Sequence, residues 1–187
     1  MSTSLEKASR QILEHKPLFF DTETTGVNDV AEIVEVGIVD SAGELVFESL
    51  VRPSRPISPD AAAVHGISDE VVQGAPTWDE VFPEIKQLFQ GKHVGIFNSG
   101  FDLRMMRQSH EQCGLAWKKV GGKAFCVMKM YTKWWGARRG IRNPRWQSLQ
   151  KAGQQCGIEL PNSHRATDDA RLTSAVFRHM AGVEVSK

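Results

Sequence analysis

The chain has 187 residues, of which 41% are hydrophobic, and its formal net charge at pH 7 is +1. This length fits one domain, residues 1–187, with a sizeable core, because two domains would each be small. The sequence has no apolar run of membrane-spanning length, no signal-peptide core and no C-x-x-C pair among its three cysteines; we therefore expect a cytoplasmic protein without a membrane partner, a disulfide framework or structural zinc.

The N-terminal part of the chain predicts a helix followed by three strands. Apolar residues at helical spacing indicate a short amphipathic helix over residues 4–15, packed on the domain. The apolar run at 18–20 begins a buried strand, and residues 31–40 and 44–51 predict two further strands joined by a hairpin turn. We therefore expect an antiparallel meander of three strands.

Two carboxylates, Asp21 and Glu23, stand at the end of the first predicted strand. Because successive side chains of a strand alternate faces, both point the same way, about 7 Å apart. Two acids on one face of a buried strand repel each other unless a cation or a proton compensates, and a divalent metal is the economical explanation. An isolated D-x-E pattern also fits solvated acids at a loop entrance, so the metal hypothesis needs support from elsewhere in the chain.

The middle of the chain predicts two helices, a strand and a third helix. A short helix is expected over residues 58–66, and a capping box at Thr77 begins a longer one. Pro83 lies inside this longer helix and is expected to bend it or shift its start. Residues 93–97 predict a buried strand followed at once by a helix, so Asp102 lies where the strand gives way to the helix. An aspartate at this place also fits a helix N-cap.

A basic segment follows. Residues 124–128 predict a fifth strand before a basic loop rich in tryptophan, and residues 147–156 predict a short helix. Ten of the 23 lysines and arginines fall within residues 118–151, whereas residues 112–158 contain no acid. A neutral protein with one basic segment often has a polyanionic partner, and a solvated face without a ligand is the alternative.

Four of the five tryptophans fall within residues 117–146. Residues 134–140 show no helical or strand period that would bury both of their tryptophan rings, and glycines flank them as in a mobile arm. Aromatic side chains interleaved with arginine and lysine are typical of sites that hold single-stranded nucleic acid. We expect this segment to hold a strand of nucleic acid, with burial of a tryptophan in the core as the alternative.

Two adjacent aspartates, Asp168 and Asp169, lie in the last predicted helix, which we expect to include His164. Asp169 shares its face with apolar residues further along the helix, whereas Asp168 lies about 100° away, over Arg171. Asp169 is therefore the candidate for a buried site and Asp168 for a solvated pair with Arg171. A histidine before a helix is by itself usually a surface or capping residue.

Taken together, these acids and the histidine resemble the motifs of the DEDDh 3′-to-5′ exonucleases, the family that includes the proofreading epsilon subunit of bacterial replicative polymerases and exonuclease X. Residues 20–26 match the first motif, residues 98–102 the second, and His164 with Asp169 the third. One departure is visible, because many relatives carry His-Asn-Ala where residues 97–100 read Phe-Asn-Ser-Gly. The segments most similar to exonuclease X are 50–59, 64–70 and 126–129.

The resemblance implies a ribonuclease H-like α/β fold with a central mixed five-stranded sheet and helices on both faces. It implies 3′-to-5′ hydrolysis of single-stranded nucleic acid, DNA favoured, with release of nucleoside 5′-monophosphates and with His164 as general base. Carboxylates without cysteine or clustered histidine make a hard, oxygen-only site suited to two Mg²⁺ or Mn²⁺ ions. The expected metal ligands are Asp21, Glu23, Asp102 and Asp169. The residues expected around the terminal nucleotide are Thr22, Thr24, Gly26, Asp60, His65, Ile67, Asn98 and Phe101.

Several alternatives stay open at this point. The expected partner is the 3′ end of single-stranded DNA, but RNA is an alternative substrate, since the contact that recognises a 2′-hydroxyl cannot be identified from these residues. A non-catalytic nucleic-acid-binding module, or one associated with a DNA polymerase, is opposed by the intact set of acids and by His164. A phosphatase with an aspartyl nucleophile would need D-x-D after the strand, where this chain has Glu23 as the second acid.

Overall fold

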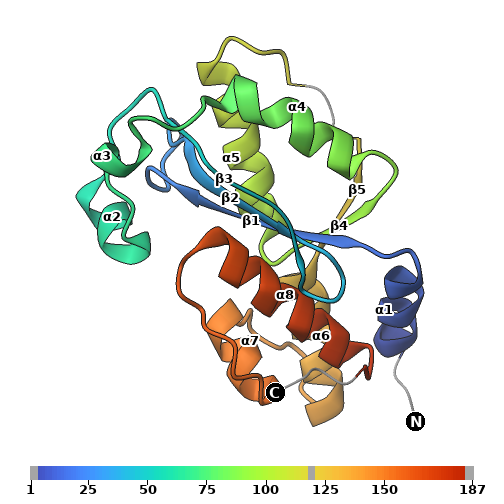
Figure 1. The fold of residues 1–187 in the computed structure, drawn as a ribbon. Helices are drawn as coiled ribbons and strands as arrows, with labels where there is room; N and C mark the ends of the chain where they lie inside the picture. The colour runs from blue at the N-terminus through green and yellow to red at the C-terminus, as the bar shows by residue number, and fades with distance from the viewer. Residues whose placement is uncertain (1–3, 118–120, 184–187) are drawn as a thin grey trace.

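The computed structural model describes residues 4–117 and 121–183, and a five-stranded sheet lies at its centre (Figure 1). The strand order is β3-β2-β1-β4-β5. Strands β1, β2 and β3 form the predicted antiparallel meander, whereas β4 is parallel to β1 and β5 is parallel to β4. The predicted mixed five-stranded sheet is therefore confirmed. The strands are β1 Leu18–Thr24, β2 Ile33–Val39, β3 Leu45–Leu50, β4 His93–Ile96 and β5 Lys123–Cys126.

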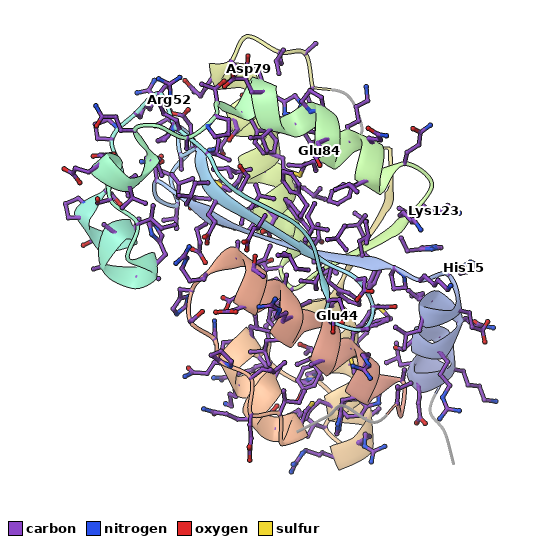
Figure 2. All side chains as sticks on the ribbon, in the orientation of Figure 1. His15, Glu44, Arg52, Asp79, Glu84 and Lys123 are labelled. Carbon is purple, nitrogen blue, oxygen red and sulfur yellow. The ribbon has the colours of Figure 1, made fainter. Side chains whose placement is uncertain are left out.

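Helices cover both faces of this sheet, as predicted (Figure 1). Helices α4 and α5 lie on one face, α1, α6, α7 and α8 lie on the other, and α2 and α3 lie at one end of the sheet. Side chains fill the space between the sheet and the helices on either side (Figure 2). The helices are α1 Ser4–Glu14, α2 Pro59–His65, α3 Asp69–Val72, α4 Trp78–Phe89, α5 Ser99–Gln112, α6 Val127–Arg139, α7 Leu149–Cys156 and α8 Ala166–Met180.

The alternation of side chains along β1 decides which layer each site residue faces. Phe20 packs in the cluster shared with α4 and α5, and Phe19 packs in the cluster shared with α6 and α8. By the two-residue period of a strand, Asp21 and Glu23 share the face of Phe19, and Thr22 shares the face of Phe20. The two carboxylates therefore face the layer that contains α8.

Gly37 allows the first turn of α8 to approach β2 closely. A Cβ atom at this position would lie 2.3 Å from the backbone nitrogen of Thr167, closer than real contacts permit. The Thr167 hydroxyl also donates to Glu48 on β3, over a distance of 3.0 Å. The start of α8 is thus docked on two strands of the meander.

Several element boundaries differ from the sequence-based expectation. Helix α1 ends at Glu14 and strand β5 ends at Cys126, one and two residues earlier than predicted. The Thr77 capping box is present, and α4 starts at Trp78, so Pro83 does not shift the start of the helix. Among the described residues, no helix has the length and apolar character needed to cross a membrane.

The prediction of a mobile basic loop at 134–140 is wrong, because α6 runs through most of it as a helix. Trp134 is buried in the cluster shared with α8. The guanidinium carbon of Arg138 lies 5.1 Å from the Trp134 ring centroid, and that of Arg139 lies 4.9 Å from the Trp135 ring centroid. Residues four apart on a helix are neighbours, so stacked arginines cover these rings without the apolar stripe that the prediction looked for.

The glycines of this region serve close packing and helix termination, not flexibility. A Cβ atom on Gly136 would lie 2.6 Å from Pro144, so this glycine permits close packing of the chain that follows α6. Gly140 ends the helix in the left-handed conformation, with φ 68°. Residues 118–120 of the predicted basic segment lie outside the described residues.

Candidate active site

Four carboxylates lie near one another around strand β1. Asp21 and Glu23 come from β1, Asp102 from the first turns of α5, and Asp169 from the first turn of α8. Burial, followed by the charges of Asp102 and Asp169, raises the pKa of Asp21 well above its usual range. The structure therefore brings together the four acids that the sequence analysis selected as metal ligands.

The other three carboxylates show the same perturbation. Burial and the charge of Asp169 raise the pKa of Glu23 to about 8, and burial raises the pKa of Asp102 to about 7. Burial also raises the pKa of Asp169. Four neighbouring acids whose pKa values are all raised disfavour their own charged forms, and a cation bound among their oxygens would compensate those charges.

Thr22 holds Asp102 in place from the opposite face of β1. Its hydroxyl donates a hydrogen bond of 2.9 Å to Oδ1 of Asp102, and both residues are buried. Asn98 occupies the N-cap position of α5, so the alternative of Asp102 as an N-cap is wrong. The predicted contact of Thr22 with the nucleotide stays a prediction, and the structure adds this contact with Asp102.

We expect Asp102→Asn to stabilise the metal-free protein at pH 8 by about 1–3 kcal/mol and to have little effect near pH 4. The pKa of Asp102 is raised to about 7 in the folded chain. Between pH 4 and pH 7 the unfolded chain therefore loses this proton first, and the folded state loses stability as the pH rises. The asparagine removes the charge, and its amide oxygen can still accept the Thr22 hydroxyl.

Thermal denaturation in EDTA at both pH values measures this effect, with Asp168→Asn as the matched control on a carboxylate at the protein surface. A gain of the same size at pH 4 and pH 8 would attribute the stabilisation to packing and contradict the electrostatic explanation.

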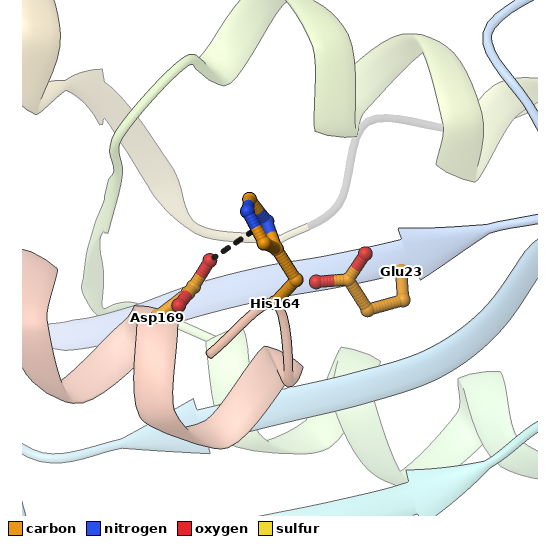
Figure 3. A group of neighbouring side chains, drawn as sticks. All are labelled: Glu23, His164 and Asp169. Carbon is orange, nitrogen blue, oxygen red and sulfur yellow. Dashed lines mark ion pairs between the residues drawn. The ribbon is translucent and has the colours of Figure 1, made fainter. Parts of the chain in front are cut away.

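Asp169 faces inward and His164 lies beside it (Figure 3). Oδ2 of Asp169 accepts a hydrogen bond of 2.7 Å from Asn162 and lies 4.0 Å from Nδ1 of His164. Oδ1 of Asp169 is buried and has no hydrogen-bond partner among the described residues. One ligand atom each from Glu23, His164 and Asp169 lie within 4.8 Å of one another. An orphaned buried carboxylate oxygen inside such a group fits a cation site.

Asp168 lies on the outer side of the same helix. Its carboxylate accepts the Ser163 hydroxyl at 2.7 Å and pairs with Arg171 at 3.3 Å. The helical-face argument is therefore confirmed in its geometry, since Asp169 is buried and Asp168 forms the predicted i,i+3 pair. His164 was expected inside this helix, but α8 starts at Ala166 and His164 lies in the preceding loop.

His65 is buried and connects α2 to the end of β1. Its Nδ1 accepts the backbone N–H of Ile67 at 3.0 Å, so its Nε2 carries the proton and donates to the carbonyl oxygen of Thr24 at 3.1 Å. Burial lowers the pKa of His65, which favours this neutral form. The contacts of His65 hold the loop after Glu23 in position.

The remaining residues predicted around a nucleotide differ in their accessibility. Asp60 and Asn98 are exposed, and Phe101 is half-buried with the Arg104 guanidinium carbon 5.5 Å from its ring centroid. Ile67 is packed in a small apolar cluster under α2 and α3. The Thr24 hydroxyl donates to the carbonyl oxygen of Gly26 at 2.7 Å. Contacts of these residues with a nucleotide stay predictions.

Comparison with known proteins decides the family. The exonuclease family model named for RNase T matches residues 18–177. The chain is 32% identical over 185 residues to the uncharacterized exonuclease CP81 of Escherichia phage 186, which covers 96% of this chain and 95% of that protein. It is 29% identical to the DNA polymerase III subunit epsilon of Pasteurella multocida, over 98% of this chain and 73% of the relative. This chain belongs to the DEDDh exonuclease family.

Solved structures agree with this assignment. Exonuclease X in complex with 5′ overhanging duplex DNA superposes with a TM-score of 0.63 at 28% identity, over 90% of this chain and 94% of the other. The nuclease domain of 3′hExo, a DEDDh family member bound to rAMP, shares the fold with a TM-score of 0.69 at 18% identity, over 92% and 96% of the two chains. The chain is an exonuclease, and its family depends on divalent metal ions.

Sequence reasoning missed two residues beside the active site of this exonuclease. Glu35 is buried in the middle of β2 and lies directly opposite Glu23 in the antiparallel ladder. Arg165, the residue after His164, forms an ion pair with Glu35. A single carboxylate inside the otherwise apolar strand of residues 33–39 was the available signal, because a buried charge needs a partner.

Proposed function

We propose that this exonuclease removes nucleoside 5′-monophosphates from the 3′ end of single-stranded DNA with the help of two Mg²⁺ or Mn²⁺ ions. The observation that carries the proposal is the convergence of four buried or half-buried carboxylates with raised pKa values around the orphaned Oδ1 of Asp169. Acids in this arrangement repel one another, and bound divalent cations would relieve the repulsion.

The donor set fits such ions. Asp21, Glu23, Asp102 and Asp169 offer carboxylate oxygens, the ligands that Mg²⁺ and Mn²⁺ prefer. Asp21 interacts electrostatically with the other three, so it is the residue that both ions would share. When bound, the ions supply an activated water and stabilise the oxygen that leaves the phosphodiester.

The chain's own residues would supply proton transfer and orientation. Nδ1 of His164 lies beside Asp169, and the imidazole is about half exposed, so a water molecule can reach it. An imidazole ionises near neutral pH and suits the role of a base that removes a proton from that water. Thr22 and His65 would keep Asp102 and the end of β1 in position while the substrate binds.

DNA is favoured over RNA by the relatives above 25% identity, which include a DNA polymerase subunit and an exonuclease solved with DNA. The test is degradation of 5′-labelled single-stranded DNA and RNA side by side, with Mg²⁺ or Mn²⁺ and with excess EDTA. We expect shortening from the 3′ end, faster on DNA, and no product in EDTA. Undiminished cleavage in EDTA, or cleavage from the 5′ end, would contradict the proposal, and faster loss of RNA would assign the RNA alternative.

The basic segment would hold the substrate strand away from the reacting phosphate. Residues 121–158 contain eight lysines and arginines and no acid, and Trp146 is 69% exposed. Arg138 and Arg139 cover tryptophan rings, so Arg142 and Arg145, which are exposed beside Trp146, are better candidates for contacts with phosphates. Exposed aromatic rings among basic residues bind single strands by stacking and by salt-sensitive phosphate contacts.

We expect Arg142→Gln combined with Arg145→Gln to weaken binding of oligothymidylate roughly 10-fold and to reduce the slope of log Kd against log salt by about 1. Hydrolysis of the minimal substrate thymidine 5′-monophosphate nitrophenyl ester should stay unchanged, because the segment takes no part in the chemistry. Fluorescence anisotropy over a salt series measures the first effect, with Arg107→Gln on α5 as the matched control. If oligonucleotide binding and ester hydrolysis fell equally, these arginines would belong to the active-site scaffold. If neither fell, they would be solvated surface residues without a ligand.

A further inference from the structure

We propose that Glu35 and Arg165 are positioning residues that hold His164 where it can act on the attacking water. The inference rests on the proposed function, in which His164 is the base. It concerns residues of β2 and of the loop before α8 that no motif of the sequence analysis included.

The geometry of the pair is that of a fixed support. Nε of Arg165 donates to both carboxylate oxygens of Glu35, at 2.9 and 3.2 Å, and Nη2 donates to Oε1 as well. The same carboxylate accepts the backbone N–H of Ala166 at 2.8 Å. Two-pronged pairing of a guanidinium with a carboxylate restricts orientation as well as distance. Both the residue after His164 and the first residue of α8 are therefore attached to one buried side chain.

His164 needs such support because its backbone conformation is unfavourable. Its φ is 53°, in the left-handed region that a residue with a side chain enters only at an energetic cost. The residues before it are held from the other side, by Asn162 on Asp169 and by Ser163 on Asp168. The contacts of Arg165 complete the restraint, so the loop is held on both sides of the histidine.

Stability alone does not explain the pair. Glu35 lies opposite Glu23 in the ladder, and like charges at directly opposed positions of a sheet destabilise it. A buried ion pair is also often no more stable than an apolar replacement of similar size. Helix α8 has independent docking contacts through Gly37 and through Thr167 with Glu48. Glu35 instead holds Arg165 and Ala166, the two residues that directly follow His164.

The test is a double-mutant cycle between Arg165→Gln and His164→Ala. We expect Arg165→Gln to lower kcat roughly 10- to 100-fold in the unmodified background, with KM changed less than about 2-fold, and to lower kcat less than about 3-fold in the His164→Ala background. Glu35→Gln should behave in the same way. Glu48→Gln is the matched control, because it removes a negative charge next to the start of α8 without touching Arg165, and we expect it to leave kcat unchanged.

Two readouts do not depend on activity. In the metal-free protein, Arg165→Gln should shift the backbone NMR resonances of His164 toward those of a flexible loop, and Glu48→Gln should not. The affinity for Mn²⁺ should stay within about 3-fold of the unmodified value in Arg165→Gln. Unchanged His164 resonances, or an equal loss of kcat in both backgrounds, would overturn the positioning role. Absence of metal-dependent hydrolysis in the unmodified protein would instead reject the proposed function, and the resonances of His164 would still decide the inference.

Discussion

Asp169→Asn is expected to lower kcat for 3′-end hydrolysis by at least about 10³-fold, and Asp168→Asn to retain nearly full activity. The two aspartates are neighbours in the sequence but face opposite environments. Asp169 is buried with one orphaned oxygen, in the group with Glu23 and His164, whereas Asp168 pairs with Arg171 at the helix surface. Asparagine keeps the size of each side chain, so the comparison isolates the charge.

The measurement is release of nucleoside 5′-monophosphates from a 5′-labelled oligonucleotide under saturating Mn²⁺, together with calorimetric titration of Mn²⁺. Asp169→Asn should also lose metal affinity, and it should keep or raise the thermal stability of the metal-free protein, because burial raises the pKa of this carboxyl group. Inactive Asp168→Asn with active Asp169→Asn would show that the wrong face of α8 has been assigned to the site.

His164→Ala is expected to lower kcat by roughly 10²- to 10⁴-fold, the usual contribution of a general base. Nδ1 of His164 lies 4.0 Å from Oδ2 of Asp169, and a ring nitrogen lies within 4.8 Å of a carboxylate oxygen of Glu23, so the structure allows two roles, base and metal ligand. A base leaves the carboxylate site intact when it is removed. We therefore expect the Mn²⁺ affinity of His164→Ala to stay within about 3-fold of the unmodified value.

Single-turnover hydrolysis and Mn²⁺ titration of the same variant separate these roles. His15→Ala is the control, because His15 is an exposed histidine directly after α1, with its ring centroid 5.0 Å from that of His93. A fall in Mn²⁺ affinity that matches the fall in rate would assign His164 as a ligand and contradict its role as the base.

Local periodicity explains why much of the site was predictable. Strand alternation places Asp21 and Glu23 on one face, and helical phase separates Asp169 from Asp168, and both predictions agree with the structure. These properties depend only on residues a few positions apart. The three motifs are far apart in the sequence, and it was the resemblance to a known family that assigned them to one site.

Local periodicity also explains the main error. The prediction assumed that Trp134 and Trp135 could be covered only if they belonged to an apolar stripe. In the structure, Arg138 and Arg139, one turn further along α6, lie over their rings. Residues 134–139 belong to this helix, in which it is the guanidinium groups of the two arginines that lie over the tryptophan rings. Contacts of this kind depend on side-chain conformation, which hydrophobic periodicity does not describe.

The sequence by itself determined the succession of the five strands, the shared face of Asp21 and Glu23, and the inward face of α8, because each follows from the period of a local element. Only the tertiary structure decided how distant segments support one another. Thr22 and Asp102 are 80 residues apart in the chain, and Glu35 and Arg165 are 130 apart. Many carboxylates in the sequence could accept hydrogen bonds from the Thr22 hydroxyl or the Arg165 guanidinium. The packing of α5 and α8 against the sheet selects one carboxylate for each donor.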